Sequence, residues 1–378
     1  MLQIIHISTA GGAEKHTRLI TKAFARCGLH VTIVYPPGDY ACEFAALSSY
    51  GVDCIEFDIK RNVAASILFL RNLIKQKNIN LIHSHMLGAD LLAMCACAGM
   101  RNVRHFTTIH NLPQDKFGFW YRLRCTILTI ISYHAMAKIF AVSKPVARRA
   151  RRSLFLSKDK VAVTLNSIDF SEMTVSNEEA EKLKHRLSPS GDAKILLCAG
   201  ILFSRKKGQE FIIRALHRLK GTQPQLKLVL LGTGEGEHDL RELVRKLKLE
   251  SLVEFPGYQP NICDWLSVAD IYIQPSIFDP LPRALLEAMY MKRPVIASDI
   301  DTMRQVVCDK ENGLLVPVRS SDAIADAIEY ILQNREHALR MAENAHAFVR
   351  DNCSMDTMAR TTLTALGIKV YNSHGPTA

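Results

Sequence analysis

The chain has 378 residues, of which 48% are hydrophobic and 22% are charged, and its formal net charge at pH 7 is +11. This length predicts two domains, and the composition is that of a soluble globular protein. No segment offers about twenty apolar residues free of charge, which excludes a membrane-spanning helix. The positive charge favours an acidic partner, and three classes stay open: nucleic acid, an anionic membrane surface and phosphorylated substrates.

The first half of the chain alternates predicted strands with predicted helices. Apolar runs and helical periodicity place these elements at 2–7, 13–27, 30–35, 53–57, 63–77, 80–85 and 88–99. The turn after the first strand contains Gly11 and Gly12, which allow the backbone to approach a ligand at the start of the next helix. The turn lacks the Gly-x-Gly-x-x-Gly pattern, so it gives little support to a nicotinamide-binding site.

Histidines lie at the ends of two predicted strands. His85 closes the strand at 80–85, and His110 lies in the segment 106–111, FTTIHN. Because open parallel sheets bind ligands beyond the carboxyl ends of their strands, we expect both side chains to border one crevice. For His110 the structural alternative is a strand-end histidine that hydrogen-bonds to backbone. Carboxylates and thiols at suitable spacing are missing, so we expect no zinc site.

Between Asp115 and Asp159 the chain has no acidic residue, ten Lys and Arg residues and many aromatic and aliphatic ones. Two helices are predicted here, at 117–136 and 144–152. The mixture favours contact of 116–158 with an anionic membrane, where apolar side chains enter the interface and basic ones bind phosphates. A solvated basic face over a buried core is the alternative. Nucleic-acid binding is disfavoured because no recognised nucleic-acid module surrounds the interval.

The second half continues the alternation after a polar stretch at 171–192, which we predict to be a linker. From residue 161 on, strands are expected at 161–165, 193–200, 226–231, 253–255, 271–273, 294–297 and 314–317, and helices at 208–220, 237–248, 261–269, 282–291, 321–333, 336–350 and 354–366. The alternation in both halves predicts two doubly wound α/β domains.

A strand, a proline-rich turn, a helix and a second strand follow one another in 271–299, IYIQPSIFDPLPRALLEAMYMKRPVIASD. Pro282 fixes φ at the helix start, where its missing N–H costs little. The helix start directs free N–H groups and a positive dipole end at the strand tips, which suits a diphosphate. Asp279 in the loop and Glu287 in the helix are placed to accept hydrogen bonds from sugar hydroxyls. The alternative is a helix-start acid and an ordinary surface glutamate.

This stretch resembles the C-terminal signature of the retaining glycosyltransferases of family 4, in which two acids are separated by seven residues and followed by Ala-Met and Pro-Val-Ile-Ala-Ser. Similar segments are Gly-Gly-x-Glu at 11–14, Thr-x-His at 108–110, Asn-Ser-Ile-Asp at 166–169 and Lys-Gly at 207–208. The chain departs from the family pattern at four positions, where relatives usually carry Glu, Gly, Gly and Arg: Asp279, Pro282, Ser167 and Ile201.

The resemblance extends from Ile4 to about Leu366 and implies the GT-B architecture, two doubly wound Rossmann-like domains facing across a cleft. The implied acceptor-side domain is 1–170, and the implied nucleotide-sugar domain is 193–350. The remaining residues, 351–378, are expected to form a helix that crosses back to the first domain and a frayed tail.

The implied activity is that of a retaining hexosyltransferase. It moves a sugar from a nucleotide diphosphate sugar, expected to be a UDP-sugar, to a hydroxyl of a membrane-associated glycan or glycolipid, as in lipopolysaccharide or surface polysaccharide biosynthesis. In the implied donor site, Arg205, Lys207 and the helix start at Pro282 hold the diphosphate. Glu287 holds the ribose, Asp279 holds the sugar ring, and His110 lies beside the anomeric carbon. The residues implied to border the cleft are Gly12, His85 and Asn166.

No cofactor and no metal are expected. The pair Asp299-x-Asp301 matches a metal-binding motif, but that motif belongs to a different glycosyltransferase architecture. Scattered cysteines and a strand-like start directly after Met1 predict a cytoplasmic protein, peripheral on the inner face of the membrane. Two alternatives stay open: a sugar-nucleotide epimerase of the same fold, and a non-catalytic binding or scaffold protein with a degenerate site.

Overall fold

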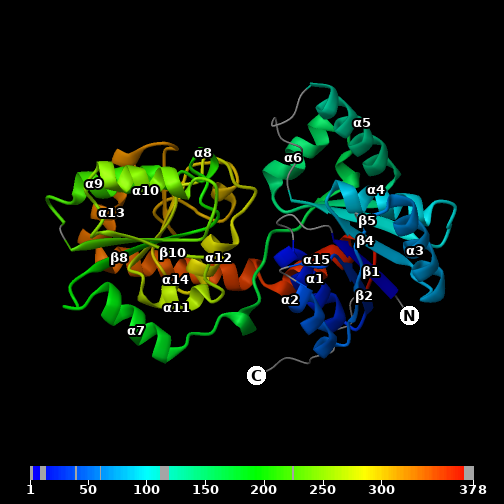
Figure 1. Ribbon diagram of the computed structural model, residues 1–378, viewed down its shortest axis with the longest axis horizontal. Coiled ribbons are helices and arrows are strands. Elements are labelled where there is room, and N and C mark those ends of the chain that lie inside the picture. The colour runs from blue at the N-terminus through cyan, green and yellow to red at the C-terminus, as the bar shows by residue number, and fades with distance from the viewer. Residues whose placement is uncertain are drawn as a thin grey trace. The chain divides into compact units, whose positions relative to one another are not determined.

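The computed structural model describes residues 3–8, 14–38, 41–59, 61–110, 119–223 and 225–369, and it describes side chains outside 3–8, 119–125 and 204. The chain divides into two compact units. Unit 1 contains the described residues up to Ser167 together with those from Met355 onward, and unit 2 contains Ile168–Ser354. In each unit a parallel sheet is covered by helices (Figure 1).

Unit 1 is built on a seven-stranded sheet in the order β3-β2-β1-β4-β5-β6-β7. Its strands are β1 (Gln3–Ser8), β2 (His30–Tyr35), β3 (Asp53–Glu56), β4 (Leu81–His85), β5 (Arg104–Ile109), β6 (Lys138–Ala141) and β7 (Val161–Val163). The order changes direction between β1 and β4. In doubly wound sheets such a switch point opens a ligand-binding crevice at the carboxyl ends of the strands.

Helices cover both faces of this sheet. They are α1 (Glu14–Arg26), α2 (Ala41–Ala45), α3 (Val63–Gln76), α4 (Leu87–Cys97), α5 (Phe119–Ala135), α6 (Lys144–Ser153) and α15 (Met355–Ala365), with 3₁₀ turns η1 (Ala46–Tyr50) and η2 (Lys158–Lys160). One face carries α1 and α15, and the other carries α3 and α4 (Figure 1). Burial on both faces explains why the strands read as continuous apolar runs.

The last helix, α15, completes the core of unit 1 although it is far from the rest of the unit in sequence. Leu363 is fully buried in one cluster with Leu19 and Phe24 of α1. The side chain of Arg104, at the start of β5, donates a hydrogen bond to the backbone carbonyl of Leu366 (2.8 Å). The C-terminal helix is therefore a structural part of the first unit.

Unit 2 contains a six-stranded parallel sheet in the order β10-β9-β8-β11-β12-β13. Its strands are β8 (Lys194–Ala199), β9 (Leu226–Leu231), β10 (Val253–Gly257), β11 (Ile271–Gln274), β12 (Val295–Ser298) and β13 (Leu314–Val316). Its helices are α7 (Asn177–Leu187), α8 (Ser204–Lys207), α9 (Gln209–Leu219), α10 (Glu237–Lys246), α11 (Ile262–Val268), α12 (Arg283–Tyr290), α13 (Ser321–Gln333) and α14 (Arg335–Asn352), with 3₁₀ turns η3 (Phe170–Glu172) and η4 (Met303–Gln305). The strand order changes direction between β8 and β11. Among the helices in the described parts of the chain, none is both long and apolar enough to cross a membrane.

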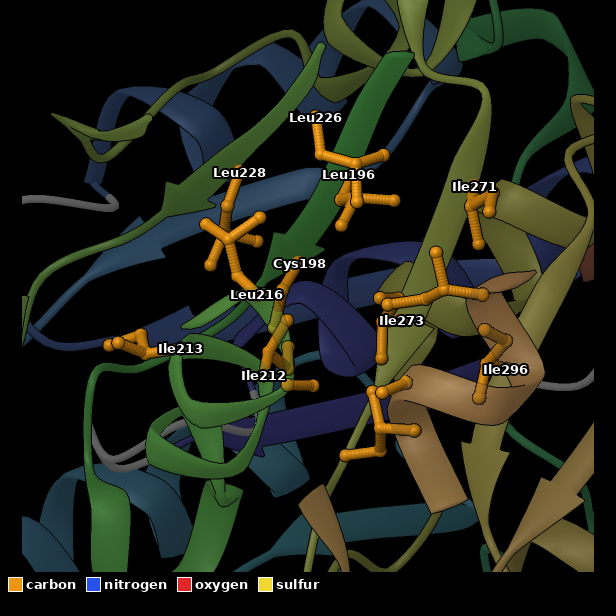
Figure 2. Packing of buried hydrophobic residues seen from close by; sticks show 14 of the residues in the cluster. Leu196, Cys198, Ile212, Ile213, Leu216, Leu226, Leu228, Ile271, Ile273 and Ile296 are labelled. Atoms are coloured by element: carbon orange, nitrogen blue, oxygen red, sulfur yellow. The ribbon is translucent and has the colours of Figure 1, made fainter. Parts of the chain in front are cut away.

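A hydrophobic cluster of the unit 2 core lies between the sheet and helices α9, α10, α13 and α14. Figure 2 shows side chains from β8, β9, β11 and β12 meeting side chains of α9; those labelled are Leu196, Cys198, Leu226, Leu228, Ile271, Ile273 and Ile296 from the strands and Ile212, Ile213 and Leu216 from the helix. Full burial of one such aliphatic side chain contributes about 1.5–3 kcal/mol. This core gives the loops at the strand ends a rigid base.

The structure corrects the predicted linker at 171–192. This segment is part of unit 2 and contains α7, whose Leu183 and Leu187 are buried. The backbone N–H of Ser176, the residue before α7, donates to Asp264 of α11 (2.7 Å). Two leucines one turn apart are enough to bury one stripe of a helix that is otherwise polar, and polarity alone suggested a linker.

We expect replacement of Leu363 by Ala to lower the free energy of unfolding by about 2–5 kcal/mol, because it removes a fully buried side chain from the core between α1 and α15. Chemical denaturation of the full chain measures this change. Thr364→Ala, at an exposed position on the same helix, is the control and should change stability by less than about 0.5 kcal/mol. Equal effects of the two substitutions would contradict the assignment of α15 to the core.

Candidate functional site

The residues expected to bind the donor converge in unit 2 at the point where its strand order changes direction. The segment after β8 leads into α8, which carries Lys207, and the loop after β11 carries Asp279 and leads into α12 at Pro282. Both segments start at the carboxyl ends of neighbouring strands, so their side chains reach the same edge of the sheet.

Direct backbone contacts hold these two segments together. The N–H groups of Ile277 and Phe278 donate to the carbonyl of Lys206 (2.8 and 3.1 Å). Gly208 ends α8 with a φ of +70°, and a Cβ at this position would collide with the carbonyl oxygen of Pro275. Only glycine combines this left-handed conformation with such a close approach of the two backbones. The position of Lys207 relative to the second loop is therefore set by the backbone.

Lys207 and Asp279 form a partly buried ion pair. The Lys207 Nζ donates to the Asp279 Oδ2; the Asp279 side chain is 4% exposed and the Lys207 side chain 23% exposed. The Ser276 hydroxyl also donates to Oδ2 (3.3 Å), and the Thr302 hydroxyl donates to the Asp279 carbonyl (2.7 Å). The cation expected to bind phosphate and the acid expected to bind sugar are thus paired with each other, and the lysine keeps access to solvent.

A chain of side-chain hydrogen bonds runs from β11 to this pair. The Tyr272 hydroxyl donates to the Gln274 amide oxygen (2.7 Å), and the Gln274 amide nitrogen donates to the Ser276 hydroxyl (2.8 Å). These three residues are buried. Because the Gln274 amide and the Ser276 hydroxyl each have a partner on either side, the orientation of the Ser276 hydroxyl toward Asp279 is specified from the core of the sheet.

The start of α12 brings a second cation that sequence reasoning missed. Pro282 precedes the first helical residue, Arg283, and offers no side-chain cap to the free N–H groups. The Arg283 NH2 donates to the Glu287 Oε1 (3.3 Å). The Nε and NH1 atoms of Arg283 are buried and have no hydrogen-bond partner among the described residues. The sequence contained one indication of this contact: Arg283 and Glu287 are four positions apart, a spacing that predicts an ion pair on a helix.

Three further residues considered in the sequence analysis lie outside this ion pair. Arg205 is exposed on α8, and Ile201, which stands where relatives usually carry Arg, is 64% exposed. Asp299 is bound by both carboxylate oxygens to the guanidinium of Arg304, with a distance of 2.7 Å between Oδ2 and NH2. Hydrogen bonding to Arg304 lowers the pKa of Asp299. Its pairing with Arg304 leaves little reason to assign Asp299 to a metal site.

In unit 1 the structure brings His85 and His110 together at the carboxyl ends of β4 and β5. The His110 Nε2 lies 3.5 Å from the His85 Nδ1. His16, in the first turn of α1, joins them, with its ring centroid 4.6 Å from that of His110. Sequence reasoning missed His16, because nothing in a helical histidine indicates that its helix starts beside two strand ends. Burial lowers the pKa of His110 to about 4, so its imidazole is neutral at pH 7.

Two other residues, Asn166 and Gly12, were also expected to border the cleft. Asn166 is buried after the end of β7. Gly12 lies outside the described residues, as do Asn111 and the start of the basic interval at 116–118.

Comparison with known proteins assigns both halves of the chain. The sequence family described as "Glycosyltransferase Family 4" matches residues 10–172, and the one described as "Glycosyl transferases group 1" matches residues 179–348. The chain belongs to the family 4 glycosyltransferases.

Individual relatives and structures are similar to this family 4 glycosyltransferase over different lengths. An uncharacterized glycosyltransferase of Haemophilus influenzae is 23% identical over 92% of this chain and 94% of its own length. A lipopolysaccharide core biosynthesis glycosyltransferase, LpsE, of Rhizobium meliloti is 29% identical over 49% of this chain and 53% of its own. The crystal structure of Anabaena Alr3699/HepE in complex with UDP-glucose superposes with a TM-score of 0.81 at 20% identity, covering 97% of this chain and 100% of that one. The fold is therefore GT-B.

Beside the histidines, this family 4 glycosyltransferase contains a buried polar network centred on Asp90 of α4. The hydroxyls of Ser84 and Thr107 donate to the Asp90 Oδ1 (2.6 and 2.7 Å), and Ser84 also contacts the His105 Nε2 (2.8 Å). Burial raises the pKa of Asp90 to about 6, and the hydroxyls of Ser84, Thr107 and Tyr133 partly offset this. The network links α4 to the strands that carry the histidines.

We expect the stability of unit 1 to decrease as the pH rises toward 7, through Asp90. The folded-state pKa of about 6 lies above the ordinary value of 3.8, so the folded protein binds the extra proton between these values. Ionisation of Asp90 does not lower the free energy of unfolding below pH 3.8. Its full effect, a loss of about 3 kcal/mol, is reached above pH 6. Asp90→Asn removes the titration and keeps an oxygen for the two hydroxyls. Between pH 7.5 and pH 5 the wild-type chain should gain about 1 kcal/mol over this variant in urea unfolding, and parallel pH profiles would contradict the assignment.

Proposed function

We propose that the chain transfers a hexose from a UDP-sugar to a hydroxyl of a membrane-associated glycan or glycolipid, with retention of configuration at the anomeric carbon. The observation that carries this proposal is the constellation at the switch point of unit 2. It combines the partly buried Lys207–Asp279 pair with the uncapped start of α12 and with Glu287 one turn further along that helix.

The chemistry of this constellation suits a sugar bound to a diphosphate. Lys207 and the free N–H groups at the start of α12 supply positive charge for the diphosphate that leaves during transfer. Arg205, exposed on α8, adds a second cation from the same short helix. We assign Glu287 to the ribose hydroxyls and Asp279 to hydroxyls of the transferred sugar, because ionised carboxylates accept hydrogen bonds from such groups.

The choice of UDP rests on a structural relative, since the Anabaena protein of the same fold was crystallised with UDP-glucose. In our proposal His110 positions the reacting sugar by hydrogen bonding and is not a nucleophile. Its neutral imidazole has one donor and one acceptor nitrogen, which fits that role. An oxygen of the donor phosphate takes the proton of the acceptor hydroxyl on the same face, so no covalent intermediate enters the reaction.

The surface of unit 1 supports a membrane-associated acceptor. On α6 four basic residues are exposed: Lys144, Arg148, Arg149 and Arg152. Two residues after the end of α6, Phe155 is 79% exposed between the buried residues Leu154 and Leu156. Phe155 has a φ of +53°, a conformation that costs energy for a bulky residue and here directs an aromatic ring into solvent.

Helix α5 extends this surface. Ile127 and Ile131, one turn apart, are 47% and 54% exposed, and the His134 ring of α5 contacts the carbonyl of Leu154 (3.1 Å). Exposed apolar side chains among arginines fit the interface of an anionic bilayer. Together with the similarity to the Rhizobium enzyme, named for lipopolysaccharide core biosynthesis, this leads us to propose a lipid-linked or lipopolysaccharide acceptor.

Thermal shift against UDP-, GDP- and ADP-sugars tests the donor assignment. A ligand at 100 times its dissociation constant adds about 2.7 kcal/mol to stability, so the matching UDP-sugar should raise the Tm clearly. Lys207→Ala should lose this rise relative to its own ligand-free Tm, because it removes a cation that we assign to the diphosphate. Lys246→Ala, which removes an exposed charge from α10, should keep it. No rise with any nucleotide sugar would refute the donor site, and conversion of donor to another nucleotide sugar without acceptor would indicate the epimerase.

Vesicle co-sedimentation tests the membrane assignment. Each basic residue near an anionic surface contributes about 1 kcal/mol, so changing Arg148, Arg149 and Arg152 together to Gln should weaken binding to phosphatidylglycerol-containing vesicles by roughly 100-fold. The matched control changes Arg245, Lys246 and Lys248, exposed residues of unit 2, to Gln and removes the same charge. Equal loss in both variants would mean that only net charge matters and that α6 is a solvated basic face.

A further inference from the structure

Three imidazoles meet at the switch point of the sheet in unit 1. His85 is the last residue of β4, His110 follows β5 directly, and His16 lies in the first turn of α1. One ring nitrogen from each lies within 4.8 Å of the corresponding nitrogen of the other two. His16 and His85 are buried, and His110 is partly exposed. These residues come from three segments distant in sequence, so the cluster is a product of the fold.

We propose that His16, His85 and His110 bind a zinc ion. Zinc–imidazole bonds of 2.0–2.1 Å place the ligand nitrogens of a tetrahedral site roughly 3.3 Å apart. The separation of 3.5 Å between the His110 Nε2 and the His85 Nδ1 nearly meets this value. With the third nitrogen within 4.8 Å, a shift of the His16 ring by at most about 1.5 Å completes the tripod.

The donor set selects the class of metal. Imidazole nitrogen suits Zn²⁺ and its neighbours in the first transition row, whereas Mg²⁺ and Ca²⁺ prefer oxygen ligands, and the cluster consists of histidines alone. Three protein ligands leave a fourth position for water or another oxygen ligand, as in catalytic zinc sites. Since His110 is the partly exposed member, we place the fourth position and the entry path of the ion on its side.

The surroundings hold two of the ligands in place before any ion binds. β4 is paired with β1 and β5 up to the level of His85. The His83 ring stacks on Phe106 with its centroid 4.1 Å from that of His85, and its Nε2 contacts the Thr108 hydroxyl (2.8 Å). A site on strand ends supported by a second layer of buried side chains needs little ordering when the ion binds.

Zinc content of the untagged full-length chain, loaded with Zn²⁺ and passed over a chelating resin, tests the proposal without any sugar donor or acceptor. The wild-type chain should retain about one zinc per chain, and His16→Asn and His110→Asn should each weaken zinc affinity by roughly 100-fold or more, at least the effect seen for supporting residues of zinc sites. His217→Asn, at an exposed position on α9, is the control and should retain zinc as the wild type does.

Cobalt substitution and thermal stability supply two further measurements on the same proteins. Co²⁺ bound to wild type should show the strong visible absorption of tetrahedral coordination, and the two cluster variants should lose it. Removal of zinc should lower the Tm of the wild type but not of the variants, whose circular dichroism reports whether they are folded. Retention of zinc by both folded variants, or no zinc on the folded wild type, would overturn the proposal. Neither result depends on the proposed transferase activity.

Discussion

Both units are constrained by parallel sheets whose faces are covered by helices. A parallel strand buried on both faces has room for polar side chains mainly where it ends, because a polar group in its middle loses water and must find a buried partner. The carboxyl ends of neighbouring strands lie at one edge, and a change in strand order opens that edge to a ligand. In unit 2 this edge carries Lys207, Asp279 and the start of α12, and in unit 1 it carries His85 and His110.

The Lys207–Asp279 pair gives the candidate donor site a particular energetic character. Burial of the Asp279 carboxylate costs free energy, and its attraction to Lys207 together with the hydrogen bond from Ser276 offsets this cost. A diphosphate that draws Lys207 toward itself weakens that pair, so the ligand must offer Asp279 new hydrogen-bond donors. In our proposal the hydroxyls of the transferred sugar are these donors, whereas the ribose hydroxyls, which a bare nucleotide also has, are assigned to Glu287. On this proposal the pair favours a complete nucleotide sugar over the nucleotide alone.

Much of this fold follows from periodicity and motif. The helix predicted at 321–333 has the bounds of α13, and the α/β alternation and GT-B architecture are confirmed. The strand β6 was missed because four residues between two helices carry too little pattern. The contact between Lys207 and Asp279 could not be predicted from the sequence, because 72 positions separate them and only the pairing of β8 with β11 makes them neighbours. The same holds for His16, whose role depends on where α1 begins.

The placement of α15 in unit 1 has a consequence for the order of folding during synthesis. Domains usually fold from the N-terminus as they leave the ribosome. Here unit 2 is one continuous segment, Ile168–Ser354, whereas unit 1 lacks α15 until translation has passed Met355. The apolar side chains of α1 that pack against α15 lack this cover while some 190 residues are made, which invites chaperone binding. Unit 2, although second in sequence, can therefore complete its core first, and unit 1 closes only with the last helix.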